Sequence, residues 1–361
     1  MSSRRRRYAG PVLSVLTAGA LLGAPALTSS AQAATTPKYT VKIVSSVPGV
    51  QLFGINGNGD VFGTAVQSGA ETTESFLLKA GSSAVQFLGT PGDQKNTQSS
   101  SVALGINASD AVVGYTLGSA TMIDPEDVPV EWANSTTPTT LASLNYTLGA
   151  RATGISDSGE IVGFKENFNG QGDKSFKVQG STATELPVLP NGGANADALG
   201  VSSNGFIVGD ADSSAFGRQA VEWNSGGAIT ALPLPANTFQ SQAFAVNSSG
   251  VAVGDVVLST DGESHPEMWA NGKVTELAPG TITGFNAVAN AINNSGVIVG
   301  GSGNGDGFVY QNGTATDLNT LIAPTAGLTL GAATGINAKG QIAGSATLNG
   351  QDVGYILTPA S

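Results

Sequence analysis

The sequence predicts an all-β protein, and two observations carry this prediction. Glycine accounts for 50 of the 361 residues, while charged residues make up 11% and aromatic residues 6%. Because glycine costs roughly 1 kcal/mol relative to alanine at a helical position, this composition disfavours helical bundles and coiled coils. A ten-residue pattern also recurs seven times at nearly constant spacing. Strands joined by tight turns explain both observations, and 40% hydrophobic residues suffice for a folded core.

Residues 1–33 have the features of a secretory signal peptide. Residues 4–7 are all arginine, an apolar stretch covers 11–27, and Ala-Gln-Ala at 31–33 resembles a cleavage site. Proline and glycine interrupt the apolar stretch, which is also short, so a retained membrane anchor is disfavoured. The arginines leave both the general secretory and the twin-arginine export routes open. We therefore expect a secreted, extracellular protein whose single domain is residues 34–361.

The chain that remains is strongly acidic. The whole sequence has 15 basic and 26 acidic residues, and the leader holds four of the arginines and no acid. The resulting net charge of −15 disfavours nucleic acid as a partner, because that binding needs clustered lysine and arginine. Cysteine is absent, which excludes disulfide scaffolds and thiolate metal sites. We expect a monomer that folds without a cofactor and has no membrane span after leader removal.

The repeated pattern begins with a small residue, an aliphatic residue, and Asn or Ser. A polar turn that usually contains glycine follows, and a closing glycine stands at the tenth position. Successive closing glycines are 44 to 51 residues apart, a period that suits the blades of a β-propeller. The copies are GINGNGDVFG at 54–63, GINASDAVVG at 105–114, GISDSGEIVG at 154–163, GVSSNGFIVG at 200–209, AVNSSGVAVG at 245–254, AINNSGVIVG at 291–300 and GINAKGQIAG at 335–344.

Each copy has the pattern of the first two strands of a four-stranded unit. An apolar strand ends at the Asn or Ser, whose side chain can bond its own backbone two residues on, and glycine supplies positive φ. A β-branched second strand follows, for example at Ile298 and Val299. The closing glycine permits a close backbone approach or a bulge. A variable loop, a third strand with an aromatic residue, a short turn and a fourth strand complete the unit.

The strand count predicts a closed ring. Six copies have four strands, the seventh stops after its third strand at 353–357, and one orphan strand at 39–44 precedes the first copy. These 28 strands make seven sheets of four if the N-terminal strand completes the last sheet. Closure removes exposed sheet edges. We therefore predict a seven-bladed β-propeller of four-stranded blades, with a β-solenoid as the alternative fold.

The repeats resemble the extracellular HAF repeat family, whose unit runs approximately G-I-N-x-x-G-x-V-V-G, a loop, H-A-F-L-W and N-G-x-x-x-D-L. The resemblance extends from about residue 50 to residue 358. The H-A-F tripeptide is poorly kept, since only His265-Pro266-Glu267 retains the histidine. The resemblance implies an exported bacterial repeat protein and carries no established activity over to particular residues.

His265 and three tryptophans are the first candidates for chemistry. His265 is the only histidine, and it stands where the repeat family also has histidine, which favours a structural role. Trp132, Trp223 and Trp269 could stack on sugars, but other copies have Leu, Val or Ile at this position, which favours packing between blades. No nucleophile-elbow, zinc-protease or phosphate-binding motif is present.

Acidic residues in the predicted loops are the remaining candidates. They could bind a ligand, hold Ca²⁺ if several converged, or act as a glycosidase pair. Solvated loop charge is the simpler interpretation, and the EF-hand spacing is missing, so calcium is only an alternative to having no cofactor. The candidate ligand-binding residues are Asp124, Glu126, Asp127, Asp210, Asp212, Asp255, Asp261 and Glu263.

The predicted topology assigns these acids to one face. Short turns share one end of the strands, whereas variable loops share the other, and binding residues are usually found on such loops. Our first hypothesis is a non-catalytic binding or surface-interaction module for an extracellular glycan or protein. One alternative is a carboxylate-dependent glycoside hydrolase or polysaccharide lyase, which needs two facing acids such as Asp210 and Asp255. The other is a purely structural extracellular component.

Overall fold

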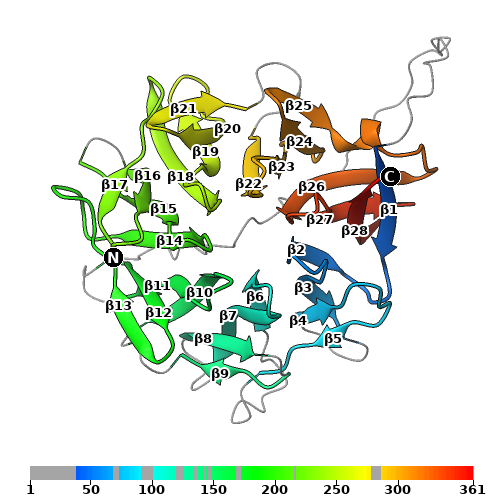
Figure 1. Ribbon diagram of the computed structural model, residues 1–361, viewed down its shortest axis with the longest axis horizontal. Helices are drawn as coiled ribbons and strands as arrows, with labels where there is room; N and C mark the ends of the chain where they lie inside the picture. Colours follow the sequence, from blue (N-terminus) through cyan, green and yellow to red (C-terminus); the bar gives the residue numbers. More distant parts are fainter. Residues whose placement is uncertain are drawn as a thin grey trace, which may run out of the picture.

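The computed structural model has the all-β architecture that the sequence predicts. It describes residues 38–67, 73–90, 101–118, 126–133, 136–141, 144, 146, 148–167, 172–214, 217–277 and 286–360. The predicted leader, residues 1–33, lies outside the described residues. Within the described residues, five four-stranded sheets and one eight-stranded sheet are arranged around a common centre (Figure 1).

The sheets follow the repeat. Strands β2 to β25 form six consecutive units of four strands, and β26 to β28 begin the seventh. The eight-stranded sheet contains the second and third units, which a single parallel pairing of Gly149 with Asp127 joins. The strands are β1 (Tyr39–Val44), β2 (Gln51–Ile55), β3 (Val61–Val66), β4 (Thr73–Leu78), β5 (Gln86–Phe87), β6 (Ser101–Ile106), β7 (Ala111–Gly118), β8 (Glu126–Ala133), β9 (Thr139–Thr140), β10 (Gly149–Ile155), β11 (Ile161–Glu166), β12 (Lys174–Gln179), β13 (Thr182–Glu185), β14 (Ala196–Val201), β15 (Ile207–Asp212), β16 (Arg218–Trp223), β17 (Ile229–Ala231), β18 (Thr238–Val246), β19 (Ala252–Leu258), β20 (Ser264–Ala270), β21 (Lys273–Glu276), β22 (Val288–Ile292), β23 (Ile298–Gly301), β24 (Gly307–Gln311), β25 (Thr314–Asp317), β26 (Leu328–Ile336), β27 (Ile342–Leu348) and β28 (Gln351–Pro359), and a 3₁₀-helix η1 (Leu318–Leu321) follows β25.

The N-terminal and C-terminal strands meet in one sheet. β1 pairs antiparallel with β28 along its whole length, from Tyr39 opposite Pro359 to Val44 opposite Gly354. The sheet order is β1-β28-β27-β26, so the N-terminal strand completes the sheet of the last unit, as the sequence predicts. This pairing covers a strand edge that would otherwise be open to other chains.

The closing glycine brings the first two strands of each unit unusually close together. A Cβ built at Gly63 would overlap the carbonyl oxygen of Gln51 on β2, and an equivalent carbonyl faces the closing glycine of every unit. The pairing register shifts beside this contact, between Leu52 and Gly54 in the first unit. Both predicted roles of the closing glycine, close approach and a bulge, are therefore confirmed.

The apolar core lies between adjacent sheets. Phe76 and Phe308, on the third strands of their units, are fully buried opposite a closing glycine. Trp132, Trp223 and Trp269 are at most 2% exposed, and each indole N–H donates to a backbone carbonyl that precedes its own unit, at 2.8 Å. The predicted packing role of the tryptophans is confirmed, and their burial rules out a sugar-stacking platform.

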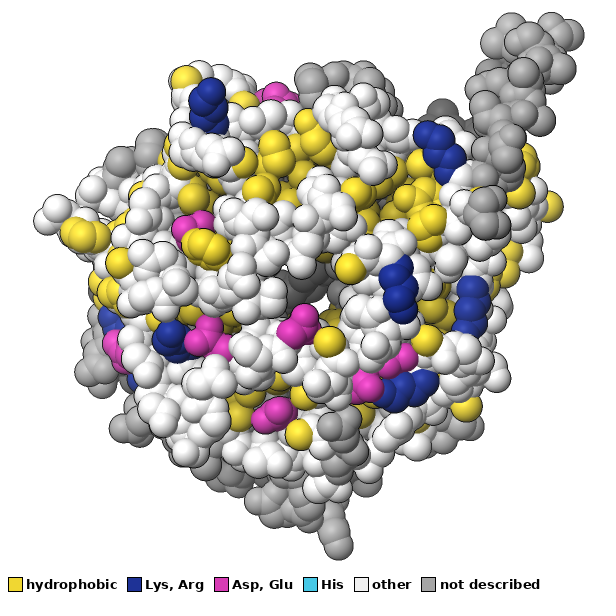
Figure 2. All heavy atoms as spheres, viewed as in Figure 1, with side chains coloured by type: hydrophobic (Ala, Val, Ile, Leu, Met, Phe, Trp, Pro, Cys, Tyr) yellow, Lys and Arg dark blue, Asp and Glu magenta, His cyan; other side chains and the backbone are white. Residues whose placement is uncertain are grey.

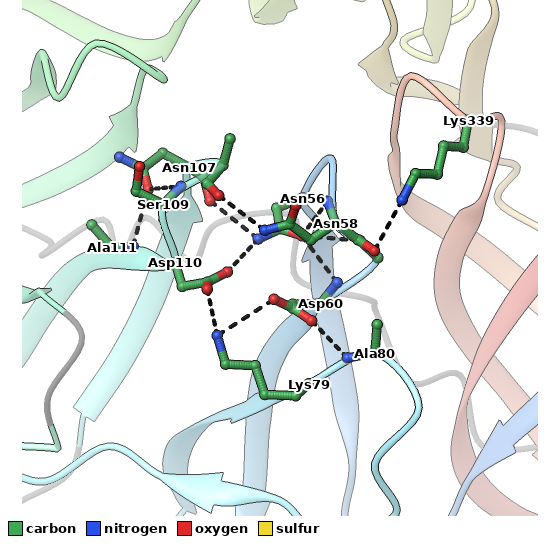
Figure 3. A network of polar contacts seen from close by, with 12 residues as sticks. Asn56, Asn58, Asp60, Lys79, Ala80, Asn107, Ser109, Asp110, Ala111 and Lys339 are labelled. Carbon is green, nitrogen blue, oxygen red and sulfur yellow. Dashed lines mark hydrogen bonds and ion pairs between the residues drawn. The ribbon is translucent and has the colours of Figure 1, made fainter.

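The turn between the first two strands is closed by an asparagine side chain. Oδ1 of Asn56 accepts hydrogen bonds from the backbone N–H groups of Asn58 and Asp60, both at 3.0 Å. Nδ2 of the same side chain donates to the carbonyl oxygen of Asn107 in the next unit, at 3.2 Å (Figure 3). One asparagine thus shapes its own turn and also links two units.

The same link recurs around the molecule and joins its two ends. Asn337 in the last unit donates to the carbonyl oxygen of Asn56 in the first, at 2.9 Å. The third and fourth units have Ser156 and Ser202 at this position, and neither hydroxyl bonds to the next unit among the described residues. We call the linking side chains the asparagine belt, which comprises Asn56, Asn107, Asn247, Asn293 and Asn337.

Replacing Gly63 with alanine should destabilise the fold strongly, because its Cβ would overlap the Gln51 carbonyl and force β2 and β3 apart. We expect the free energy of unfolding to fall by about 3 kcal/mol, the upper end of overpacking costs. Urea denaturation measures this loss. Gly57→Ala in the adjacent turn is the matched control, because a Cβ there meets nothing within 4 Å. Equal stabilities of the two variants would contradict the close approach.

Candidate functional site

The structure places the eight predicted acids in different surroundings. Asp261 and Glu263 lie between β19 and β20, where Asp261 is exposed. Asp124 lies outside the described residues, as does the side chain of Glu126 at the start of β8. The other four belong to strands, contrary to the loop positions that we expected, because the strands extend further toward this end: Asp127, Asp210, Asp212 and Asp255.

Arg218, the first residue of β16, gathers acids from two neighbouring strands. Its guanidinium contacts Asp210 and, at 2.5 Å, Asp197, and Asp212 lies 3.8 Å away. Asp197 and Asp210 are directly opposite each other on β14 and β15. Both carboxyl groups are fully buried, so two acids and one arginine form a structural ion cluster away from solvent.

Burial and ion pairing act in opposite directions on this cluster. Burial raises the pKa of the Asp197 and Asp210 carboxyls, while the positive charge of Arg218 favours their ionised forms. Gln242 on β18 donates from Nε2 to Oδ1 of Asp210 at 3.1 Å. The cluster therefore fixes the fourth unit to the fifth.

Asp255 on β19 lies beside this cluster in the next sheet. It is 8% exposed, and burial, with a smaller contribution from the charge of Asp210, raises its pKa to about 6. A hydrogen bond with Ser264 opposes that shift. Asp210 and Asp255 thus belong to adjacent sheets, and neither is exposed enough to contact a large substrate.

Arg151 on β10 forms a second ion pair between units. Its Nε and Nη2 atoms both lie 2.5 Å from Oδ2 of Asp127 on β8. The guanidinium also packs over the rings of Tyr115 and Phe164, 5.0 and 5.8 Å from their centroids. Burial raises the pKa of Asp127 and Arg151 opposes that rise. Asp127 therefore links the second and third units, at the point where their strands also pair.

His265 is bracketed by two acids near the surface. Its Nδ1 lies 3.3 Å from Oε1 of Glu276, and its Nε2 lies 3.2 Å from Oδ2 of Asp261. Burial disfavours the imidazolium, but the hydrogen bonds and charges of Glu276 and Asp261 outweigh it, so the pKa of His265 is raised. These contacts agree with the structural role that the sequence favours for this histidine.

Glu267 occupies a core position that sequence reasoning missed. It stands opposite the closing glycine Gly254, where the first and fourth units have Phe76 and Val221. It is 3% exposed, and its Oε2 has no hydrogen-bond partner among the described residues. Burial, assisted by the charge of Glu276, raises its pKa to about 8. The signal was present in the sequence, because Glu267 replaces the phenylalanine of the H-A-F tripeptide.

The described part of the chain offers no arrangement of three or more His, Cys, Asp or Glu side chains suited to a metal ion. The carboxylates of Asp197, Asp210 and Asp212 contact Arg218 instead. In the same residues, no helix has the length and apolar character needed to cross a membrane.

A shallow polar hollow lies among the short turns, at the end of the strands opposite to Arg218. Its volume is about 160 Å³, and its exposed surface is almost entirely polar. Figure 2 shows this face of the molecule hollowed near the centre and bordered mostly by uncharged side chains. The hollow collects turn residues from the third to the sixth unit, including Ser156, Asp157, Ser202, Ser203, Asn247 and Asn294.

Solved structures with a similar fold are distant in sequence. A virginiamycin B lyase from Staphylococcus aureus has a TM-score of 0.52 at 12% identity, covering 89% of this chain and 100% of that chain. A structure from a study of two prolyl endopeptidases has a TM-score of 0.51 at 9% identity, covering 90% of this chain and 51% of that one. No profile of a known protein family and no curated protein sequence matches the chain. The similarity shows a β-propeller-like repeat fold, and a fold alone does not define an activity.

Replacing Arg218 with an uncharged residue should destabilise the folded protein. Arg218→Met leaves Asp197 and Asp210 buried without a cation, and we expect the free energy of unfolding at pH 7 to fall by about 3–5 kcal/mol. Urea denaturation compares this variant with Lys273→Met, which removes the same charge from an exposed residue. A loss no larger than that of the control would contradict the proposed ion cluster.

Glu267 should make stability depend on pH. Its pKa in the folded chain is about 8, whereas an unperturbed glutamate has a pKa of about 4.3. The folded state therefore holds the proton longer, and stability contributed by the neutral acid is lost as pH rises between these values. Glu267→Val, which copies Val221 of the fourth unit, should remove this slope and be more stable than the parent at pH 8.

Urea denaturation at pH 5 and pH 8 measures the effect. Glu185→Val replaces an exposed glutamate and is the matched control. If Glu267→Val and the control changed the pH slope equally, the neutral buried carboxyl would be the wrong explanation.

Proposed function

We propose that the chain forms a closed seven-bladed β-propeller that is secreted and binds an extracellular glycan without catalysis. The blade count is supported by five four-stranded sheets and an eight-stranded sheet that contains two units. Closure is supported by the pairing of β1 with β28 and by the hydrogen bond from Asn337 to Asn56. Export rests on the basic, apolar and small-residue segments of the leader.

The burial of the main acid cluster is the observation that carries the non-catalytic part of the proposal. Carboxylate catalysis requires an acid within hydrogen-bonding reach of the substrate. Asp197 and Asp210 are 0% exposed and are paired with Arg218. Their charge therefore serves to hold strands together, and exposing them would break the ion cluster.

We call the face that carries the short turns between the first and second strands of each unit the turn face. A glycan is the favoured ligand because of the groups that this face presents. Serine hydroxyls and asparagine amides border the hollow, and these groups can bond sugar hydroxyls as donors and as acceptors. Among the described residues, Asp157 is the only carboxylate that lines the hollow, and no histidine lines it. A single acid without a second carboxylate or a base suits binding and is too little for glycoside hydrolysis.

A glycan array and a polysaccharide-degradation assay on residues 34–361 test this function. We expect saturable binding to a glycan with no released product, unchanged by EDTA. Released or unsaturated oligosaccharides would contradict the non-catalytic proposal and favour a glycoside hydrolase or a polysaccharide lyase. Loss of binding in EDTA would indicate calcium. An absence of binding to every glycan would contradict the proposal and favour a protein ligand or a structural component.

A further inference from the structure

Two carbonyl oxygens of the turn face lack the side-chain donor that their equivalents have. In five units the carbonyl at this position accepts an asparagine amide from the preceding unit. The carbonyl oxygens of Ser202 and Asn247 instead accept only the backbone N–H groups of Gly205 and Gly250 in their own turns, at 3.1 and 3.0 Å. No side chain among the described residues donates to either of them.

The cause is the pair of serines that interrupts the asparagine belt. The hydroxyl of Ser156 accepts the backbone N–H of Glu160 at 3.0 Å, and that of Ser202 accepts the N–H of Phe206 at 3.1 Å. Each serine therefore closes its own turn as an asparagine would, but it lacks the amide that would reach the next unit. Two carboxamide groups are missing from adjacent links of the belt.

The polar hollow lies where these amides are missing. Ser156, Ser202 and Asn247 all line it, so the two carbonyl oxygens that lack an amide donor belong to residues that border the space. Ser202 and Asn247 are 4% and 5% exposed. Asp157 also lines the hollow, and only its Oδ1 has a partner in the described chain, the N–H of Ala108 at 2.9 Å. The site therefore offers two carbonyl oxygens and a carboxylate oxygen, all of them acceptors.

We propose that this hollow binds an amino sugar, whose ammonium group donates to the carbonyl oxygens of Ser202 and Asn247 in place of the missing amides. The inference rests on the glycan binding proposed above and assigns it a site and a ligand class. An ammonium group has three donors and no acceptor, which matches a set of acceptors. The net charge of −15 attracts such a cation.

The remainder of the hollow favours a sugar over a lysine side chain. Ser203 has no side-chain partner in the described chain, and Nδ2 of Asn294 has none either, so both can bond sugar hydroxyls. A lysine would place its aliphatic chain against a surface that is almost entirely polar. The volume of about 160 Å³ suits one small residue of a glycan.

Calorimetric titration of residues 34–361 with glucosamine, glucose and glucuronate tests the ligand class. We expect glucosamine to bind at least tenfold more tightly than glucose, and glucuronate to bind most weakly. Equal affinities for glucosamine and glucose would overturn the role of the ammonium group. Glucosamine affinity should also fall as salt concentration rises, because the attraction is partly electrostatic.

The double variant Ser156→Asn/Ser202→Asn tests the site. It restores both missing amides, so it should fill the hollow, weaken glucosamine binding at least tenfold and raise the melting temperature. Ser249→Asn makes the same replacement at an exposed turn residue outside the hollow, and it should leave binding unchanged. Glucosamine binding that survives in a folded double variant would overturn the site.

Asp157→Asn is an independent variant should the double variant not fold. It removes the negative charge at an exposed residue and keeps an oxygen that can accept the Ala108 N–H. We expect it to weaken the binding of glucosamine and to leave the binding of glucose unchanged. Equal effects on the two affinities would contradict the proposal. If glycan-array binding were unchanged by all these substitutions, the hollow would not be the binding site, while the proposed glycan function would remain.

Discussion

The close approach of the first two strands in every unit is the constraint on which the rest of the structure depends. At each closing glycine the carbonyl of the first strand occupies the space that a Cβ would need. The strands stay paired only with a bulge, and the bulge turns a side chain toward the next sheet. Thr153 and Thr334, at such bulges, donate to carbonyl oxygens of the following unit at 2.7 and 2.9 Å. The same glycine that tightens one unit thus helps to attach it to its neighbour.

Attachment between units is polar at both ends of the strands and apolar in the middle. The asparagine belt ties the turn face, buried rings fill the centre, and arginine clusters occupy the opposite end. The belt is interrupted twice, between the third and fourth units and between the fourth and fifth units. At the second interruption the opposite end of the strands has a polar link, because Gln242 of the fifth unit donates to Asp210, which Arg218 contacts.

The structural features that could be predicted from the sequence are those that depend on the local spacing of residues. The orphan strand, its pairing with the C-terminal strand, the asparagine turns and the buried tryptophans all follow from the register of seven copies. The surroundings of the acids could not be read in this way, because Asp210 meets Arg218 through the pairing of two strands separated by a loop of variable length. The unusual character of Glu267 could have been recognised from the sequence, because the other copies have an apolar residue at this position. The hollow could not be predicted from the sequence, because serine in place of asparagine preserves the turn pattern and removes only a contact between units. That contact is visible only in the three-dimensional structure.

The two ends of the strands differ in how readily they can offer groups to a ligand. Freeing Asp197 or Asp210 would break a buried ion cluster, at a cost of about 3–5 kcal/mol. Each serine that interrupts the belt forgoes one intramolecular hydrogen bond, worth about 1 kcal/mol, and the turn itself remains closed by the hydroxyl. The acceptors left behind belong to Ser202 and Asn247, which are only 4% and 5% exposed but line the hollow, where water can satisfy them until a ligand arrives. A binding site at the interrupted belt therefore perturbs the fold far less than one built from the acids, even though the acids are the more conspicuous feature of the sequence.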